Sequence, residues 1–382
     1  MPFSYINENL KDSGSALFYR DIALALSSNF GNIAYVSPQG VDALGTVGQI
    51  DKPYKTIQAA VNALPAGGTA YIFAGTYQEA LIVRRSVTLY FYGATLQNLT
   101  ADAGHTINFV DEGGASNRYN YLKIKGFGDI IRSGGQAGSC AIKVDFLYTT
   151  DLHIDGVDIA GSNANGIFFE KGRHLYMANS RMLLYGTGNC IRLAEAFNGN
   201  SYQVERCTLK ADTDACLRLD GSGNRFLFRD TTLTSNGYVI SQNSGLYILE
   251  GCTLESYASS VITGFRNRIR AINSKFTGSV YVVDGEYIGT FFYQNCELIS
   301  KTTYPLRLKV DTANSASFQA ELNNCRLIGH SSAAAIYQYI DNTGDNTVSL
   351  VNCAGNLPLP ANTYQGIIHN YHYNTDLKEM VF

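Results

Sequence analysis

The chain has 382 residues, of which 45% are hydrophobic and 16% are charged, and its formal net charge is -3. A chain of this length and apolar content can bury a large core, so it is not a disordered segment. Without a basic surplus it is not expected to bind nucleic acid or an anionic membrane surface. The 37 glycines and 26 tyrosines, with only 7 prolines and no tryptophan, are typical of many short strands joined by tight turns.

Residues 1–33 form a leader that precedes the main pattern. Asp12 or Ser13 can cap a short helix that ends at Gly31 and carries the apolar residues Leu17, Phe18, Ile22 and Leu26. The start contains Glu8 and Asp12 rather than a charged start followed by an apolar run, so no secretory signal is visible and we expect synthesis in a cytoplasm. No later segment reaches transmembrane length, so membrane insertion is not expected.

A second helix is predicted after Pro53. Its apolar residues follow the i, i+3, i+4, i+7 spacing of one helix face, and Gly67 and Gly68 end it. These residues are Ile57, Ala60, Val61 and Leu64. We expect this helix to cover the open end of the strands that follow, whose unpaired edge is otherwise an aggregation hazard.

A repeat then fills most of the chain: a short alternating strand, a tight corner and a second short strand. Equivalent corner residues recur 21 to 29 residues apart, which are coil lengths of a solenoid. They are Val157, Ser180, Cys207, Thr231, Cys252, Ser274, Cys296, Cys325 and Cys353. The pattern predicts an all-β chain with one β-helix over residues 34–358, followed by a tail, 359–382, that caps the far end or contacts another subunit.

Asparagine and cysteine recur at the corners. Asparagine tolerates the left-handed backbone that a sharp corner needs, and its amide can bond to the next coil. The predicted asparagine ladder is Asn179, Asn273, Asn295, Asn324 and Asn352. The residues after the corner are predicted to stack inward as small core residues, including Cys207, Cys252, Cys296, Cys325 and Cys353. Since no Cys-x-x-Cys pair occurs and the six histidines are scattered, neither a disulfide framework nor a metal site is expected, and no cofactor is implied.

The segment from Val36 to Asn98 resembles a known family. The matching residues are Val36-Ser37-Pro38, Gly45-Thr46, Lys52-Pro53-Tyr54-Lys55-Thr56-Ile57-Gln58-Ala59-Ala60, Gly67-Gly68-Thr69, Gly75-Thr76-Tyr77 and Glu79. They are similar to the pectin-lyase-like superfamily of right-handed parallel β-helices. Asp42 departs from that pattern because glycine does not follow it directly. The superfamily contains polysaccharide lyases, epimerases and hydrolases, and the tailspike and tail-fibre proteins of bacteriophages.

Strand alternation places a charged outer face on four consecutive coils. Lys143, Phe168, Arg192 and Arg218 form one predicted outward file, and Asp145, Glu170 and Asp220 form the next. Lys143, Arg192 and Arg218 are the candidate ligand-binding residues. The candidate catalytic carboxylates are Asp212, Asp214, Asp220 and Glu195, since glycoside hydrolysis needs two carboxyl groups close together. A lyase would instead use Arg192 or Arg218 to neutralise a uronate and take its proton.

A simpler interpretation is that opposite charges on adjacent coils pair at the surface. The sequence has no paired Asp-Asp with a later Gly-His-Gly and no Asp-Pro-His, which mark catalytic members of the superfamily. We therefore expect an attachment or structural protein of the tailspike or tail-fibre type, without catalysis. It would be a homotrimer in a virion, joined to other virion proteins through residues 1–33 and able to bind cell-surface polysaccharide. The alternatives are a polysaccharide lyase or glycosidase and a structural solenoid without sugar binding.

Overall fold

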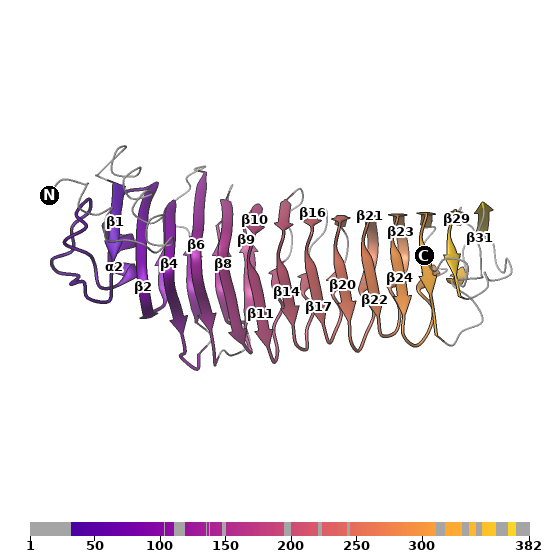
Figure 1. Cartoon of the computed structure of the whole chain (residues 1–382), viewed down its shortest axis with the longest axis horizontal. Coiled ribbons are helices and arrows are strands. Elements are labelled where there is room, and N and C mark those ends of the chain that lie inside the picture. The colour runs from indigo at the N-terminus through magenta and orange to yellow at the C-terminus, as the bar shows by residue number, and fades with distance from the viewer. Residues whose placement is uncertain are drawn as a thin grey trace, which may run out of the picture.

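The computed structural model describes residues 32–102, 104–110, 119–134, 136, 138–146, 150–194, 200–220, 224–242, 245–310, 318–330, 336–340, 346–356 and 366–371. Within them the chain winds as a rod of stacked coils, and the strands pair in parallel with those of the neighbouring coils (Figure 1). The predicted right-handed parallel β-helix is confirmed. The predicted leader helix within residues 1–33 lies outside the described residues, apart from Asn32 and Ile33.

Three faces run along the rod. The first face is built from β1 (Ile33–Val36), the first halves of β2 (Gly68–Gln78), β4 (Val87–Asn98), β6 (Asn120–Arg132) and β8 (Thr150–Ser162), then β10 (His174–Ala178), β13 (Ser201–Glu205), β16 (Asn224–Arg229), β19 (Gly245–Glu250), the second halves of β21 (Ile262–Ile272) and β23 (Val283–Gln294), β26 (Phe318–Asn323), β29 (Asn346–Val351) and β31 (Gly366–Tyr371). Its last pair, β29 with β31, extends the parallel stacking into the segment after residue 358.

The second and third faces complete each coil. The second face contains the second halves of β2, β4, β6 and β8, then β11 (Arg181–Tyr185), β14 (Thr208–Ala211), β17 (Thr232–Ser235), β20 (Thr253–Ser256), β22 (Lys275–Gly278), β24 (Glu297–Ser300), β27 (Arg326–Ile328) and β30 (Ala354–Gly355). The third face contains β3 (Leu81–Val83), β5 (His105–Val110), β7 (Cys140–Asp145), β9 (Asn165–Lys171), β12 (Ile191–Leu193), β15 (Leu217–Leu219), β18 (Ile240–Gln242), the first parts of β21 and β23, β25 (Leu306–Val310) and β28 (Ile336–Ile340).

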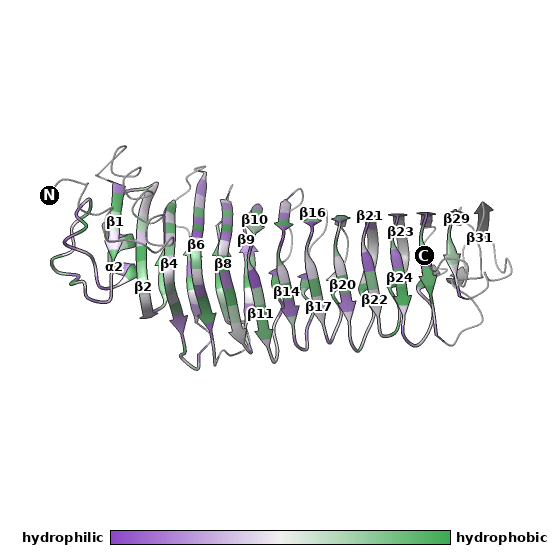
Figure 2. Cartoon of the chain, in the orientation of Figure 1, coloured by the Kyte–Doolittle hydropathy of each residue, from purple (hydrophilic) through white to green (hydrophobic). Residues whose placement is uncertain are grey.

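The core is the interior of the rod. Apolar and polar residues alternate along the strands (Figure 2), so one set of side chains points inward and stacks on its equivalents in the next coil. Ile142, Ile167, Ile191 and Leu217 are such a column, and each is at most 1% exposed. Because every coil buries its apolar side chains against the next, stability comes from stacking rather than from any single coil.

The predicted capping helix is α2 (Ile57–Ala63), which contacts the first coil through its buried residues Ile57, Ala60 and Val61. Thr56 caps it, accepting a hydrogen bond from the backbone N–H of Ala59. The Glu79 carboxylate accepts two more, from the N–H groups of Ile57 and Gln58. These acceptors satisfy donors that the first turn of a helix leaves free.

The first corner, between the first and second faces, contains the predicted asparagines. All five have φ between 50° and 53°, in the left-handed region. Asn295 donates from its amide to Asn273 Oδ1 at 3.0 Å, and Asn324 donates to Asn295 Oδ1 at 3.3 Å. Arg206, Asp230 and Gly251 occupy the same corner position, also with positive φ, so the file of asparagine amides is interrupted between Asn179 and Asn273.

The cysteines that follow these corners lie inside the rod. All eight cysteines are free and buried. The five that follow corner residues, Cys207, Cys252, Cys296, Cys325 and Cys353, are each at most 4% exposed. Burial raises the pKa of the Cys207 and Cys252 thiols to about 11, so these thiols stay protonated at neutral pH.

Candidate functional site

The outward file of the third face has the register that the sequence predicts. Lys143 pairs with Phe168, Phe168 with Arg192, and Arg192 with Arg218. The second predicted file is wrong at Asp145: the register shifts after Val144, so Asp145 lies opposite Lys171 rather than Glu170. The shift is an irregularity of β7 and β9, which strand alternation alone does not reveal.

Lys143, at one end of this file, forms ion pairs with two carboxylates. Its Nζ lies 2.5 Å from Glu170 Oε2 and 3.9 Å from Asp145 Oδ2, while Lys171 lies 3.1 Å from Asp145 Oδ1. Two coils separate Lys143 from Arg192. Of the three candidate ligand-binding cations, only Arg192 and Arg218 are neighbours.

Arg192 and Arg218 share one carboxylate. Arg192 Nε lies 3.4 Å from Asp220 Oδ2, and Arg218 Nε lies 3.2 Å from Asp220 Oδ1. Arg192 also lies over the Phe168 ring, with its Cζ 5.3 Å from the ring centroid. In the described part of the chain both guanidiniums bind Asp220 through Nε and no hydrogen bond uses their Nη groups, which are therefore available as donors.

A pocket of about 160 Å³ opens beside this pair, at the second corner, where the second face turns into the third. Its lining residues come from four successive coils and are almost all polar, glycine or alanine. They are Gly138, Asn163, Ala164, Asn165, Thr187, Gly188, Asn189, Arg192, Asp214 and Arg218. The site is thus built from backbone turns and short polar side chains, with the two arginines on one wall.

Two of the candidate catalytic carboxylates hold the turn of the preceding coil. Asp212 accepts from the Gly186 N–H at 3.1 Å through Oδ2 and from the Asn236 amide at 3.0 Å through Oδ1. Asp214 Oδ2 accepts from the Gly188 N–H at 2.9 Å. Both oxygens of Asp212 therefore accept hydrogen bonds, whereas Asp214, which lines the pocket, accepts none through Oδ1 from the described residues.

The structure thus brings Asp214, Asp220, Arg192 and Arg218 together and leaves Asp212 as a turn acceptor. The fourth candidate carboxylate, Glu195, lies outside the described residues. What this cluster can do chemically is bind polar groups: the arginines donate, and the Asp214 carboxylate accepts.

A buried pair of asparagines, Asn165 and Asn189, lines the pocket and was not predicted from the sequence. Asn165 Oδ1 accepts from both the Asn189 N–H, at 3.0 Å, and the Asn189 amide, at 3.2 Å. These bonds point the Asn189 amide nitrogen at Asn165 and its Oδ1 away, and that buried oxygen has no hydrogen-bond partner among the residues that the structure describes. The sequence does carry a signal, because each asparagine stands two residues before an inward-pointing isoleucine of the third face, Ile167 or Ile191.

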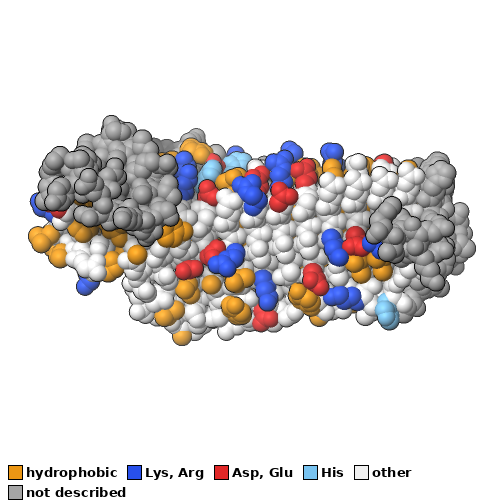
Figure 3. Space-filling model, in the orientation of Figure 1, with side chains coloured by type: hydrophobic (Ala, Val, Ile, Leu, Met, Phe, Trp, Pro, Cys, Tyr) orange, Lys and Arg blue, Asp and Glu red, His pale blue; other side chains and the backbone are white. Residues whose placement is uncertain are grey.

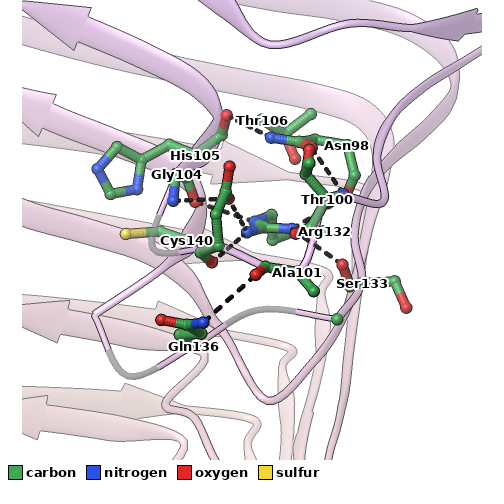
Figure 4. A network of polar contacts seen from close by, with 12 residues as sticks. Asn98, Thr100, Ala101, Gly104, His105, Thr106, Arg132, Ser133, Gln136 and Cys140 are labelled. Carbon is green, nitrogen blue, oxygen red and sulfur yellow. Dashed lines mark hydrogen bonds and ion pairs between the residues drawn. The ribbon is translucent and has the colours of Figure 1, made fainter.

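A buried arginine, Arg132, supports the backbone that leads to Asn165 (Figure 4). Arg132 is fully buried and donates to five backbone carbonyls and to Asp102 Oδ1, at 2.7 to 3.2 Å. Asp102 O also accepts from the Gln136 N–H, Gln136 O from the Ser139 N–H, and Ser139 O from the Asn165 N–H. The guanidinium therefore fixes a chain of backbone hydrogen bonds that ends at the pocket.

No three or more histidine, cysteine, aspartate or glutamate side chains in the described ranges are grouped so that they can hold a metal ion. Among the helices that can be described, none has the length and apolar character of a membrane span.

The fold and the pocket together define a right-handed parallel β-helix with a polar pocket on its outer surface. No family model and no curated protein matches the chain. Solved structures with a similar fold include a pectate lyase, Pel9A, with 12% identity, a TM-score of 0.43 and coverage of 90% of this chain and 80% of that one.

Two further solved structures show comparable values. Tailspike protein 3 of bacteriophage CBA120 has 10% identity and a TM-score of 0.41, over 81% of this chain and 55% of that chain. A family 28 exopolygalacturonase of Yersinia enterocolitica has 13% identity and a TM-score of 0.40, over 90% and 78%. At these identities the likeness concerns the fold.

Proposed function

We propose that this chain is a polysaccharide-binding β-helix of the tailspike or tail-fibre type and that it holds a surface glycan at the second corner. The observation that carries the proposal is the pocket itself. Among the described residues, it gathers Nη donors of Arg192 and Arg218 that make no hydrogen bond and an oxygen of Asp214 that accepts none. These groups can donate hydrogen bonds to the hydroxyls of a sugar and accept hydrogen bonds from them.

Attachment is favoured over catalysis because most candidate carboxylates already have structural partners. Asp212 holds a turn and Asp220 bridges two arginines. As part of the same proposal, the protein is a homotrimer located in a virion, and residues 1–33 join it to other virion proteins. Light scattering on the purified chain measures the subunit number, and a monomer would contradict the trimer.

The binding experiment uses purified chain on an array of capsular and cell-wall polysaccharides. Wild type is expected to bind some members, and Arg218→Met together with Asn189→Leu is expected to lose at least about tenfold in affinity. Arg181→Met is the matched control, because Arg181 pairs with Asp158 on the second face, outside the pocket. Failure of wild type to bind any glycan would contradict the proposal and favour a structural solenoid.

A depolymerase is the second candidate, and Asp214 is the observation that favours it. Its carboxylate lines the same pocket as two arginines and keeps one oxygen free of the turn. Incubation with the same polysaccharides, followed by reducing ends and unsaturated-uronate absorbance, tests it. Product that forms with wild type and disappears with Asp214→Asn would identify an enzyme, while bound but uncut glycan would support attachment alone.

A further inference from the structure

The cations along the second corner and the adjoining third face already have carboxylate partners. Asp220 serves both Arg192 and Arg218, and Asp214 adds a second negative charge to their pocket. Two more pairs follow towards the C-terminal end: Lys301 with Glu255 at 3.0 Å and Arg307 with Asp284 at 3.1 Å. Side chains of both signs also lie next to each other on the face seen in Figure 3.

This balance decides what the pocket can accept. A carboxylate entering it would meet Asp214, and arginines whose charge Asp220 already balances, so it would gain little net attraction after losing its water. A hydroxyl group both donates and accepts. It can take a hydrogen bond from an arginine Nη and give one to Asp214 Oδ1, without adding charge.

The pocket is one end of a longitudinal file. Register places Asn189 two residues before Ile191, and the equivalent residues in the next five coils are Ala215, Tyr238, Ser260, Tyr281 and Tyr304. At about 4.8 Å per coil, this file runs for about 24 Å. Tyr238 is 39% exposed, and the Tyr281 and Tyr304 rings are stacked with centroids 6.5 Å apart.

The tyrosines also explain why the pocket is open. Arg307 lies over the Tyr281 ring, with its Cζ 5.2 Å from the centroid, and Tyr281 stands in the preceding coil. Arg218 has the same relationship to Asn189. Where the file carries tyrosine the ring occupies the space beside the arginine, and where it carries asparagine a pocket remains.

We infer that the second corner binds a neutral, linear glycan that lies parallel to the rod axis, with one sugar in the pocket and later sugars on Tyr238, Tyr281 and Tyr304. This inference rests on the proposed function and names its ligand class. A tyrosine ring offers an apolar face and a polar tip, which suits the apolar C–H face and hydroxyl rim of an uncharged sugar.

The test compares matched probes on wild-type protein. Acidic capsular polysaccharides are used in native form and after carboxyl reduction, which replaces each uronate carboxylate with a primary hydroxyl. The reduced chains, and neutral polysaccharides, are expected to bind at least about tenfold more tightly than the native acidic chains. Their affinity is expected to stay nearly constant between about 50 and 500 mM salt, because no net charge is screened.

Asp220→Asn tests whether the paired carboxylate sets the preference for neutral chains. It leaves Arg192 and Arg218 without their shared carboxylate, so affinity for the native acidic chains is expected to rise and to become salt-dependent. Asp158→Asn, which removes the partner of Arg181 on the second face, is the control. It is expected to change neither the affinity for acidic chains nor the salt dependence of that affinity. Circular dichroism establishes that each variant is folded.

Tyr281→Leu tests the direction of the glycan. It is expected to weaken binding of long neutral chains while leaving binding of a disaccharide fragment unchanged, whereas Phe127→Leu, an exposed aromatic of β6, is expected to change neither. Preference of wild type for acidic chains, with affinity that falls as salt rises, would overturn the inference and leave the proposed function standing. Absence of binding to every glycan would overturn both.

Discussion

Asn165 accepts two hydrogen bonds from Asn189 through a single side-chain oxygen, and both residues are more than 90% buried. Each asparagine thereby links one coil to the next at the second corner. The Asn165 N–H and amide in turn donate to Ser139 O. This pair is the inward counterpart of the exposed asparagines at the first corner.

Replacing Asn165 with leucine keeps its volume and removes the acceptor. The N–H and the amide of Asn189 then lie buried without a partner, so the free energy of unfolding is expected to fall by about 2–4 kcal/mol. Urea unfolding measures it. Asn163→Gly is the control, because Asn163 is exposed with φ 53° and glycine adopts that conformation readily. A small loss for Asn165→Leu, equal to that of the control, would show that water replaces the lost bond.

Arg132 is expected to be the most sensitive charged residue of the N-terminal coils. Methionine in its place leaves five carbonyl oxygens and Asp102 without their donor, so a loss of about 3–5 kcal/mol is expected. Lysine keeps the charge but has three donors instead of five. The stability of Arg132→Lys is therefore expected to lie between that of wild type and that of Arg132→Met. Denaturant midpoints should rank wild type, Arg132→Lys, Arg132→Met; a midpoint for Arg132→Lys equal to that of wild type would mean that charge, not donor number, holds the loop.

The repeat made the architecture predictable, because the corner residues and inward columns recur at a spacing that only a stacked coil explains. Where equivalent positions carry different residue types from coil to coil, the repeat did not predict the local structure. Arg206 and Asp230 adopt the left-handed corner conformation without being asparagine, since the surrounding coils impose it. The pocket depends on Asn189 standing at a position where three later coils carry tyrosine, a pattern that appears only when the third-face register is known.

Asn295 tests how much the first corner depends on residue type. Alanine there must adopt φ 53° and loses the amide bonds to Asn273 and Asn324, so a loss of about 1–2 kcal/mol is expected. Asn295→Gly keeps the backbone free of strain and is expected to lose less. The difference between the two variants in thermal unfolding measures the conformational part, and a glycine variant as unstable as the alanine one would assign the effect to the amide ladder instead.

The thiols should be unreactive in the folded protein. Burial raises the pKa of Cys140 to about 12 and that of Cys207 and Cys252 to about 11, so little thiolate forms at pH 8 and reagents cannot reach it. All eight cysteines are therefore expected to react with Ellman's reagent in urea and none at a comparable rate in buffer. Rapid reaction of even one thiol in buffer would show that a coil opens locally.

Acid stability should carry a contribution from Asp151. Burial acts to raise the pKa of this carboxyl, but hydrogen bonds from His153 and the Tyr119 hydroxyl, together with the nearby His174, outweigh it and lower the pKa below its ordinary value. A carboxyl with a depressed pKa in the folded state stabilises the protein above its unfolded-state pKa and loses that contribution as pH falls through the folded one.

The stability difference between wild type and Asp151→Asn is therefore expected to be constant above about pH 5 and to shrink below about pH 4. Denaturant unfolding at a series of pH values measures it. Asp129→Asn serves as the comparison, because Asp129 is exposed on β6. If the difference for Asp151 instead grew as the solution was acidified, burial would dominate at this site, and the hydrogen bonds from Tyr119 and His153 would not hold the carboxylate charged.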